Sequence, residues 1–143
     1  MIVKRAETEE DFRRIAPVLL QLRPSFTIDS LVVQIQRQRA EGFHVAYVEA
    51  DGEVLCVAGY VFGTKLAWGK HIYVDDLVTD ERRRSTGAGK AMIDWLKAEA
   101  RAAGCQSLQL DSGVQRFRAH GFYLREGFKI SAHHFAIPDL ARS

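Results

Sequence analysis

Cysteines, prolines and long apolar runs are all scarce in this chain, and their scarcity excludes several classes of protein. The only two cysteines, Cys56 and Cys105, each lie in an apolar segment. A disulfide scaffold is therefore not expected, no Cys/His cluster has the spacing of a zinc site, and we expect core cysteines and no metal. No apolar stretch approaches the roughly 20 residues that cross a bilayer. With three prolines and no low-complexity run, nothing marks an interdomain linker.

The charge balance is close to neutral. A formal net charge of +2 is too small to indicate a nucleic-acid protein, so we expect neither nucleic acid nor a membrane as a partner. The first residues enter a strand-like pattern at once and lack a secretory apolar core, which makes the cytoplasm the expected location. The length of 143 residues predicts one domain over 1–143.

Hydrophobic periodicity predicts a mixed α/β domain built on one sheet. A capping-box pattern, Thr8 with Asp11, begins a helix in which Pro17 predicts a kink or an early break. Asp51-Gly52 between two apolar runs predicts a β-hairpin. The expected strands are 2–6, 43–49, 54–62, 71–79, one around 108–110, and 128–137, and the expected helices are 9–22, 28–41, 89–103 and 115–125.

The most informative segment is the turn Arg84-Ser85-Thr86-Gly87-Ala88-Gly89, which connects the strand 71–79 to the helix 89–103. Backbone N–H groups at a helix start, together with the positive end of the helix dipole, bind phosphate. Positive charge beside the turn comes from Arg82, Arg83 and Lys90. This charge either attracts the cofactor or forms a solvated basic surface. The segment therefore predicts a site for a phosphate-bearing cofactor.

Two common phosphate-loop patterns do not fit this turn. A nucleotide P-loop requires serine or threonine after Gly89-Lys90, where the chain has Ala91, and a glycine in place of Arg84. The dinucleotide fingerprint requires a third glycine where the chain has Met92. What remains is Arg-x-x-Gly-x-Gly between a strand and a helix.

That pattern resembles the acyl-coenzyme A loop of the GNAT N-acetyltransferase superfamily. A second motif, Ala119-His120-Gly121-Phe122-Tyr123-Leu124-Arg125-Glu126-Gly127-Phe128, is similar to the family's Ala-x-x-Phe-Tyr-x-x-x-Gly-Phe. The chain departs from the family at Ser85, where glycine is usual and where a positive φ would be strained, and at Arg116, where asparagine is usual. The resemblance implies the acyl-CoA N-acyltransferase fold: α/β, with a single mixed, mainly antiparallel sheet flanked by helices and splayed central strands.

The resemblance also implies direct acetyl transfer from acetyl-CoA to a primary amine. The pyrophosphate would bind the backbone of Arg84, Ser85, Thr86, Gly87, Ala88, Gly89 and Lys90, and the pantetheine arm that of Leu77, Val78 and Thr79. Tyr123 is the candidate general acid for the departing thiolate, with helix-to-sheet packing as its alternative role. Asp75 is the candidate general base, although Asp75 and Asp76 could instead pair with Arg82 or Lys70. Acidic residues near the cleft favour a small cationic amine as acceptor.

Three functional alternatives stay open from the sequence: an acyltransferase that uses a longer acyl group or an oxygen acceptor, a nucleotide-binding regulator, and a non-catalytic module. The same fold could serve as a non-catalytic acyl-CoA-binding or regulatory module, although the retained Tyr123, the complete glycine turn and the acidic strand favour catalysis. A homodimer formed through the last strand is a further hypothesis.

Overall fold

The computed structural model describes residues 1–142, which divide into two compact units, one before and one after the boundary between Leu110 and Asp111. The first unit holds nine elements. They are β1 (Ile2–Ala6), α1 (Glu9–Leu22), α2 (Ile28–Arg39), β2 (Phe43–Ala50), β3 (Glu53–Lys65), β4 (Gly69–Thr79), the short 3-10 helix η1 (Glu81–Arg83), α3 (Ala88–Ala102) and β5 (Ser107–Leu110). The second unit holds α4 (Phe117–Arg125) and η2 (Leu140–Arg142).

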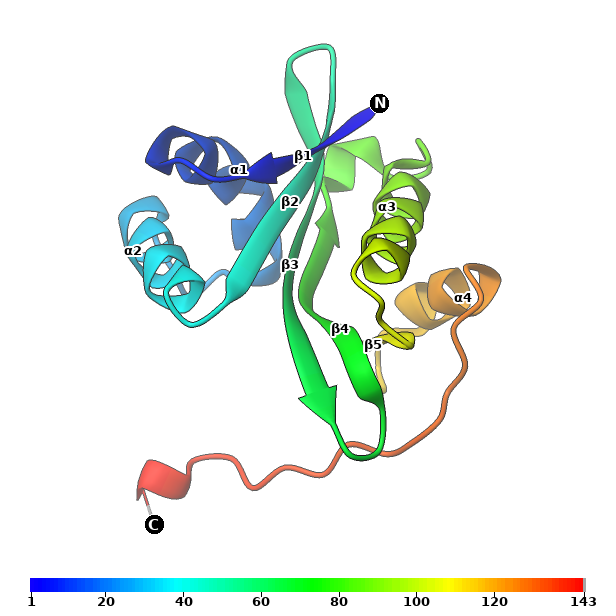
Figure 1. Ribbon diagram of the computed structural model, residues 1–143. Coiled ribbons are helices and arrows are strands. Elements are labelled where there is room, and N and C mark those ends of the chain that lie inside the picture. The colour runs from blue at the N-terminus through cyan, green and yellow to red at the C-terminus, as the bar shows by residue number, and fades with distance from the viewer. Residues whose placement is uncertain (143) are drawn as a thin grey trace. The chain divides into compact units, whose positions relative to one another are not determined.

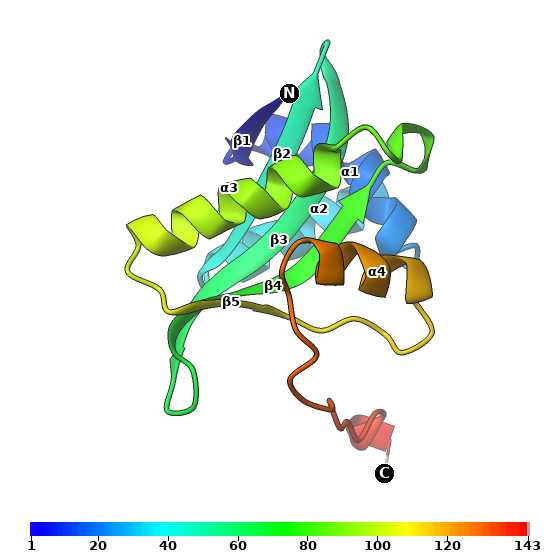
Figure 2. The same ribbon diagram turned by 90° about the vertical axis from the view of Figure 1, so that its right-hand side faces the viewer.

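The first unit is built on one open five-stranded sheet in the order β1-β2-β3-β4-β5. The first three pairings are antiparallel and the last, β4 with β5, is parallel. Helices α1 and α2 cover one face of this sheet and α3 lies across the other (Figure 1; Figure 2). The mixed, mainly antiparallel sheet flanked by helices is the fold class that the sequence predicts.

The α1/α2 face carries the larger apolar core. Side chains with helical spacing on α1, such as Phe12, Ile15 and Leu19, lie in one buried cluster with alternate residues of β2, such as Val45 and Tyr47. On the other face α3 buries Ala88, Met92, Ile93, Leu96 and Ala100. Because side chains alternate along a strand, one sheet supplies both layers.

Local signals in the sequence place most boundaries correctly. Thr8 and Asp11 form the expected capping box, and α1 runs over the expected 9–22. The early break at Pro17 is wrong, because the helix continues to Leu22 with its buried face intact. The hairpin at Asp51-Gly52 is confirmed, and β3 and β4 extend further toward each other than predicted, to Lys65 and Gly69.

The predicted last strand, 128–137, is wrong. The structure has no strand in this segment, and its apolar side chains are largely exposed, with Ile130 at 79%, Phe135 at 91% and Ile137 at 81%. The pattern of β-forming residues is present, but a strand also needs a neighbour to accept its backbone hydrogen bonds, and no described strand pairs with it. No helix within residues 1–142 is both long and apolar enough to span a membrane.

Candidate cofactor and active site

One edge of β4 is left without a strand partner over its second half. The pairing of β4 with β5 covers only His71–Val74 and Ser107–Leu110, whereas β4 continues to Thr79. Leu77, Val78 and Thr79 are half-buried and are paired only on the β3 side within the first unit. Their remaining peptide groups can therefore bond to an extended ligand, as the splayed strands of the predicted fold require.

The start of α3 is an uncapped helix N-terminus. Its N-cap residue is Gly87, whose φ of +89° is a left-handed conformation that suits glycine. The first intrahelical bond runs from the N–H of Ala91 to the carbonyl of Gly87 at 2.9 Å, so the N–H groups of Ala88, Gly89 and Lys90 have no acceptor within the helix. The N-cap Gly87 makes no side-chain cap hydrogen bond, and no acidic residue lies in the first turn of α3.

The other two helices of the first unit differ in both respects. Helices α1 and α2 each begin with a capping box and carry acidic residues in their first turn, which compensate the helix dipole. The positive end of the α3 dipole lacks such compensation. An anion placed at this helix start would supply both acceptors for the N–H groups of Ala88 and Gly89 and the missing negative charge.

Ser85 adopts the strained conformation that its departure from the family pattern predicts. Its φ is +65°, a region where non-glycine residues are uncommon. The next residue holds the turn in place, because the Thr86 hydroxyl donates to the carbonyl of Arg83 at 2.7 Å. The turn therefore keeps its shape with serine where glycine is usual.

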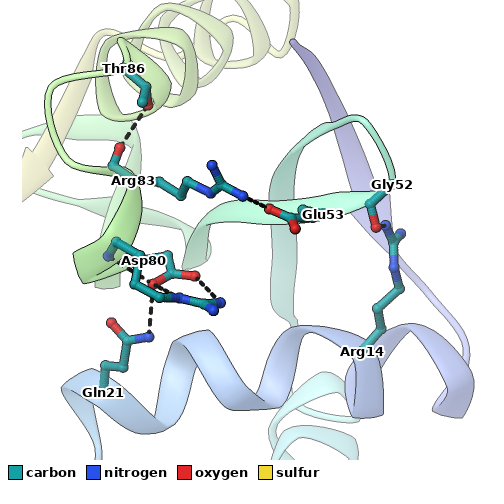
Figure 3. A network of polar contacts seen from close by, with 8 residues as sticks. Arg14, Gln21, Gly52, Glu53, Asp80, Arg83 and Thr86 are labelled. Atoms are coloured by element: carbon teal, nitrogen blue, oxygen red, sulfur yellow. Dashed lines mark hydrogen bonds and ion pairs between the residues drawn. The ribbon is translucent and has the colours of Figure 1, made fainter.

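The three consecutive arginines have three different roles, and Figure 3 shows Arg83 reaching toward Glu53. Arg82 folds back onto Asp80, with a nitrogen–oxygen distance of 3.0 Å. Arg83 forms an ion pair with Glu53 at the start of β3. Arg84 is exposed, and no described residue pairs with its guanidinium. Arg82 and Arg83 therefore brace the turn, which neither sequence interpretation of them anticipated, and Arg84 is available to a ligand.

Asp80 is the anchor of the turn, and sequence reasoning missed it. Its side chain is 3% exposed and accepts from the backbone and side chain of Arg82 and from Gln21 of α1. The Arg82 side chain, more than any other partner, lowers the pKa of Asp80 to about 2. Figure 3 shows Gln21 reaching Asp80, and Gln21 also accepts from the backbone N–H of Glu81 at 3.0 Å. The last turn of α1 therefore holds the segment that leads into the turn 84–90.

Asp75 and Asp76 have different surroundings. The Asp76 carboxylate accepts from Arg23 at 2.8 Å and is 14% exposed. Asp75 is exposed at the surface, and no described residue forms an ion pair with its carboxylate. Partial desolvation of its carboxyl raises the pKa of Asp75, and the adjacent Asp76 carboxylate raises it further. The positive charge of Arg23 lowers this pKa by a smaller amount. The predicted pairing with Arg82 or Lys70 is absent in residues 1–142, since Arg82 binds Asp80 and Lys70 donates to the carbonyl of Ala103.

Tyr123 belongs to the second unit, on α4. Its ring makes edge-on contacts with Phe122 at 5.4 Å and Phe128 at 5.6 Å between centroids. The carbonyl of Tyr123 also accepts from the N–H of Phe128 at 3.0 Å, which closes the end of the helix. The residues of the second sequence motif therefore form one local aromatic cluster that orients the Tyr123 ring.

Comparison with known proteins decides the family. The model of the Acetyltransferase (GNAT) family matches residues 6–128, which include both motifs. The chain belongs to the GNAT family. It is therefore an acyltransferase, and the donor that GNAT enzymes use is acetyl-CoA.

Individual relatives agree with this assignment. The chain is 28% identical over 138 residues to the Uncharacterized N-acetyltransferase YhdJ of Bacillus subtilis (strain 168), covering 95% of this chain and 97% of that protein. It is 37% identical over 62 residues to the Aminoalkylphosphonate N-acetyltransferase of Salmonella typhimurium, covering 43% and 40% of the two chains. The solved Ribosomal-protein-alanine N-acetyltransferase from Brucella melitensis biovar Abortus 2308 superposes with a TM-score of 0.82 at 17% identity, over 96% and 99%. This last likeness concerns the fold.

Within the first unit, the structure brings together most of the predicted GNAT site. The turn 84–90 follows directly from the half of β4 that carries Asp75 and the unpaired edge. This arrangement is completed by Gln21, Arg23 and Asp80. The sequence carried a weak signal for Asp80 only. Asp80 stands immediately after a strand and before the turn, where an Asp side chain commonly caps backbone N–H groups.

Proposed function

We propose that this protein transfers the acetyl group of acetyl-CoA directly to a primary amine of a small cationic acceptor. The observation that carries the proposal is the uncapped, acid-free N-terminus of α3, next to the exposed Arg84 and continuous with the unpaired edge of β4. A pyrophosphate needs the first feature and a pantetheine arm needs the second. The two occur in the order in which one extended coenzyme A molecule requires them.

The residues of the turn would bind the donor by its phosphates. Backbone N–H groups of Ala88, Gly89 and Lys90 would donate to the pyrophosphate oxygens, and Gly87 leaves the approach open because no atom lies within 4 Å of the position of a Cβ there. Arg84 would add a charge-assisted contact. Ser85 and Thr86 complete the loop around the same phosphates.

The unpaired edge of β4 would align the arm and activate the thioester. Peptide groups of Leu77 and Thr79 can pair with the amides of the pantetheine as a strand would. A backbone N–H near Val78 can donate to the thioester oxygen. Such a donor, aimed at the negative charge that develops on that oxygen, contributes on the order of 3 kcal/mol to transition-state stabilisation.

Proton transfers would be made by Asp75 and Tyr123. The amine attacks the thioester carbonyl carbon, a C–N bond forms and the C–S bond breaks. Asp75 accepts the proton that the amine loses, and its raised pKa makes it a stronger base than an ordinary aspartate. Tyr123 donates a proton to the sulfur that leaves. Since Arg23 neutralises Asp76, Asp75 is the carboxylate left to attract a cationic acceptor.

The proposal is tested by the release of coenzyme A thiol from acetyl-CoA in the presence of a panel of amines, which includes aminoalkylphosphonates because one relative carries that name. We expect release with at least one cationic amine. We also expect Tyr123→Phe to lower kcat while leaving the Kd for coenzyme A nearly unchanged.

Two outcomes would contradict the proposal. Binding of coenzyme A without release by any amine would favour a non-catalytic binding module. A melting temperature raised by ATP and not by coenzyme A would exclude coenzyme A recognition altogether.

A further inference from the structure

Strand β4 contains a bulge at Asp75. In the pairing with β3, Gly59 lies opposite Asp76 and Tyr60 lies opposite Val74, so that Asp75 has no partner on β3. A bulge bends its strand and redirects the side chains beside it. The extra residue is thus the one that we assign as the base, and its direction depends on what holds the bulge.

Arg23, the C-cap residue of α1, spans this bulge. Its Nε donates to Oδ1 of Asp76 at 2.8 Å, and its Nη2 donates to the backbone carbonyl of Asp75 at 3.1 Å. One planar guanidinium therefore binds the main chain of the bulge residue and the side chain of the residue that follows it. Arginine suits this task because its donors are fixed relative to one another.

Strand β3 holds Asp76 from the opposite direction. A Cβ at Gly59 would lie 2.7 Å from Oδ2 of Asp76 and 2.4 Å from the ring of Phe43. The carboxylate therefore occupies space that only glycine leaves open. With Arg23 on one oxygen and the Gly59 backbone close to the other, Asp76 has little freedom to move.

We propose that Arg23 is a positioning residue for acetyl transfer: it fixes the bulge that aims Asp75 and neutralises Asp76, so that Asp75 alone receives the proton of the acceptor amine. This inference rests on the proposed function, because it assigns a role within that reaction. It explains why two adjacent carboxylates occur on one strand, one of them structural and the other chemical.

The charged groups around Asp75 make the role measurable. Asp76, on the same strand, raises the pKa of Asp75, and Arg23, from α1, lowers it. From β3, Tyr60 lies across from Val74, and burial raises the pKa of its phenol, which keeps it neutral. The buried residues of α3 are uncharged, and β5 ends at Leu110 beside uncharged Gln109.

Three variants separate charge from geometry. Arg23→Met removes the cation and should move the acid limb of the kcat/KM profile to higher pH. Asp76→Asn removes the neighbouring carboxylate and should move the same limb to lower pH. Arg23→Lys keeps the charge but not the bidentate contact, so the acid limb should stay near its wild-type position. The kcat should fall at least about tenfold, because a misplaced catalytic group lowers the rate.

Two further measurements keep the test independent of folding and of turnover. Arg13→Met serves as the matched control, because Arg13 also lies on α1 and pairs with an exposed acid, Asp29, at 2.9 Å. It should leave the pH profile unchanged. Carbon-detected NMR titration of the Asp75 carboxyl, without substrate, should show the same opposite shifts for Arg23→Met and Asp76→Asn.

The outcomes distinguish this inference from the proposed function. The wild-type enzyme could be active while the acid limbs of Arg23→Met and Asp76→Asn shift in the same direction, or do not shift. That result would overturn the role of Arg23 alone. A wild-type protein that acetylates no amine would refute the proposed function, and the catalytic role of Arg23 with it.

Discussion

Replacement of Asp80 by asparagine is expected to weaken the whole segment before α3. Asparagine keeps the shape of the side chain and one oxygen that can cap the backbone. It removes the negative charge that binds Arg82 and that accepts the hydrogen bond from Gln21. The lowering of the Asp80 pKa from an ordinary 3.8 to about 2 corresponds to about 2 kcal/mol of folding free energy at about 1.36 kcal/mol per unit. Because the Arg82 side chain is 78% exposed, water screens the pair, and we expect a loss of about 1–2 kcal/mol at pH 7.

The sign of the pH dependence follows from the direction of the pKa change. A carboxyl whose folded pKa is lowered stabilises the protein above its unfolded pKa of about 4, and this stabilisation is lost as the pH falls through about 2. The free energy difference between wild type and Asp80→Asn should therefore be about half as large at pH 3 as at pH 7.

Urea unfolding followed by circular dichroism at both pH values measures this difference. Asp94→Asn is the matched control, because Asp94 pairs with Lys90 on the surface of α3 at 3.4 Å and should cost at most about 0.5 kcal/mol. Equal stability of Asp80→Asn and wild type at pH 7 would refute the anchoring role. A difference that does not shrink at pH 3 would refute its electrostatic origin.

Three further substitutions test the turn and the strand. Ser85→Gly should raise the free energy of unfolding by about 0.5 kcal/mol, because glycine relieves the φ of +65°, and a loss on urea unfolding would contradict the strain. Gly59→Ala should cost about 1–3 kcal/mol, because its Cβ would clash with Phe43 and Asp76, and a neutral result would mean that β3 can move. Arg84→Gln should raise the Kd for coenzyme A about tenfold by calorimetry without changing Tm, and an unchanged Kd would remove Arg84 from the site.

The parts of the molecule that follow local rules could be predicted from the sequence. Thr8 with Asp11 begins α1, and Asp51-Gly52 turns the first hairpin, because capping and turn formation depend on residues a few positions apart. The glycine turn before α3 follows the same rule. Gly87 stands between a strand and a helix that periodicity alone identifies, and Gly89 lies in the first turn of that helix.

What could not be predicted depends on contacts between distant segments. Nothing in the sequence pairs Arg23 with Asp76, 53 positions away, or Gln21 with Asp80, 59 positions away. The bulge at Asp75 is a property of two strands and not of one. The prediction of a strand at 128–137 was wrong for a related reason. The residue pattern shows that a segment is able to form a strand, but it does not show whether a neighbouring strand is there to pair with it.

The central claim is that main-chain amides at the start of α3 bind the pyrophosphate of coenzyme A. The most direct test is a titration of ¹⁵N-labelled protein with coenzyme A, followed amide by amide. We expect the largest downfield shifts at Ala88, Gly89 and Lys90, whose N–H groups lack a helical acceptor. Saturation of binding with those three signals unmoved, or no shift of any signal at millimolar coenzyme A, would contradict the claim.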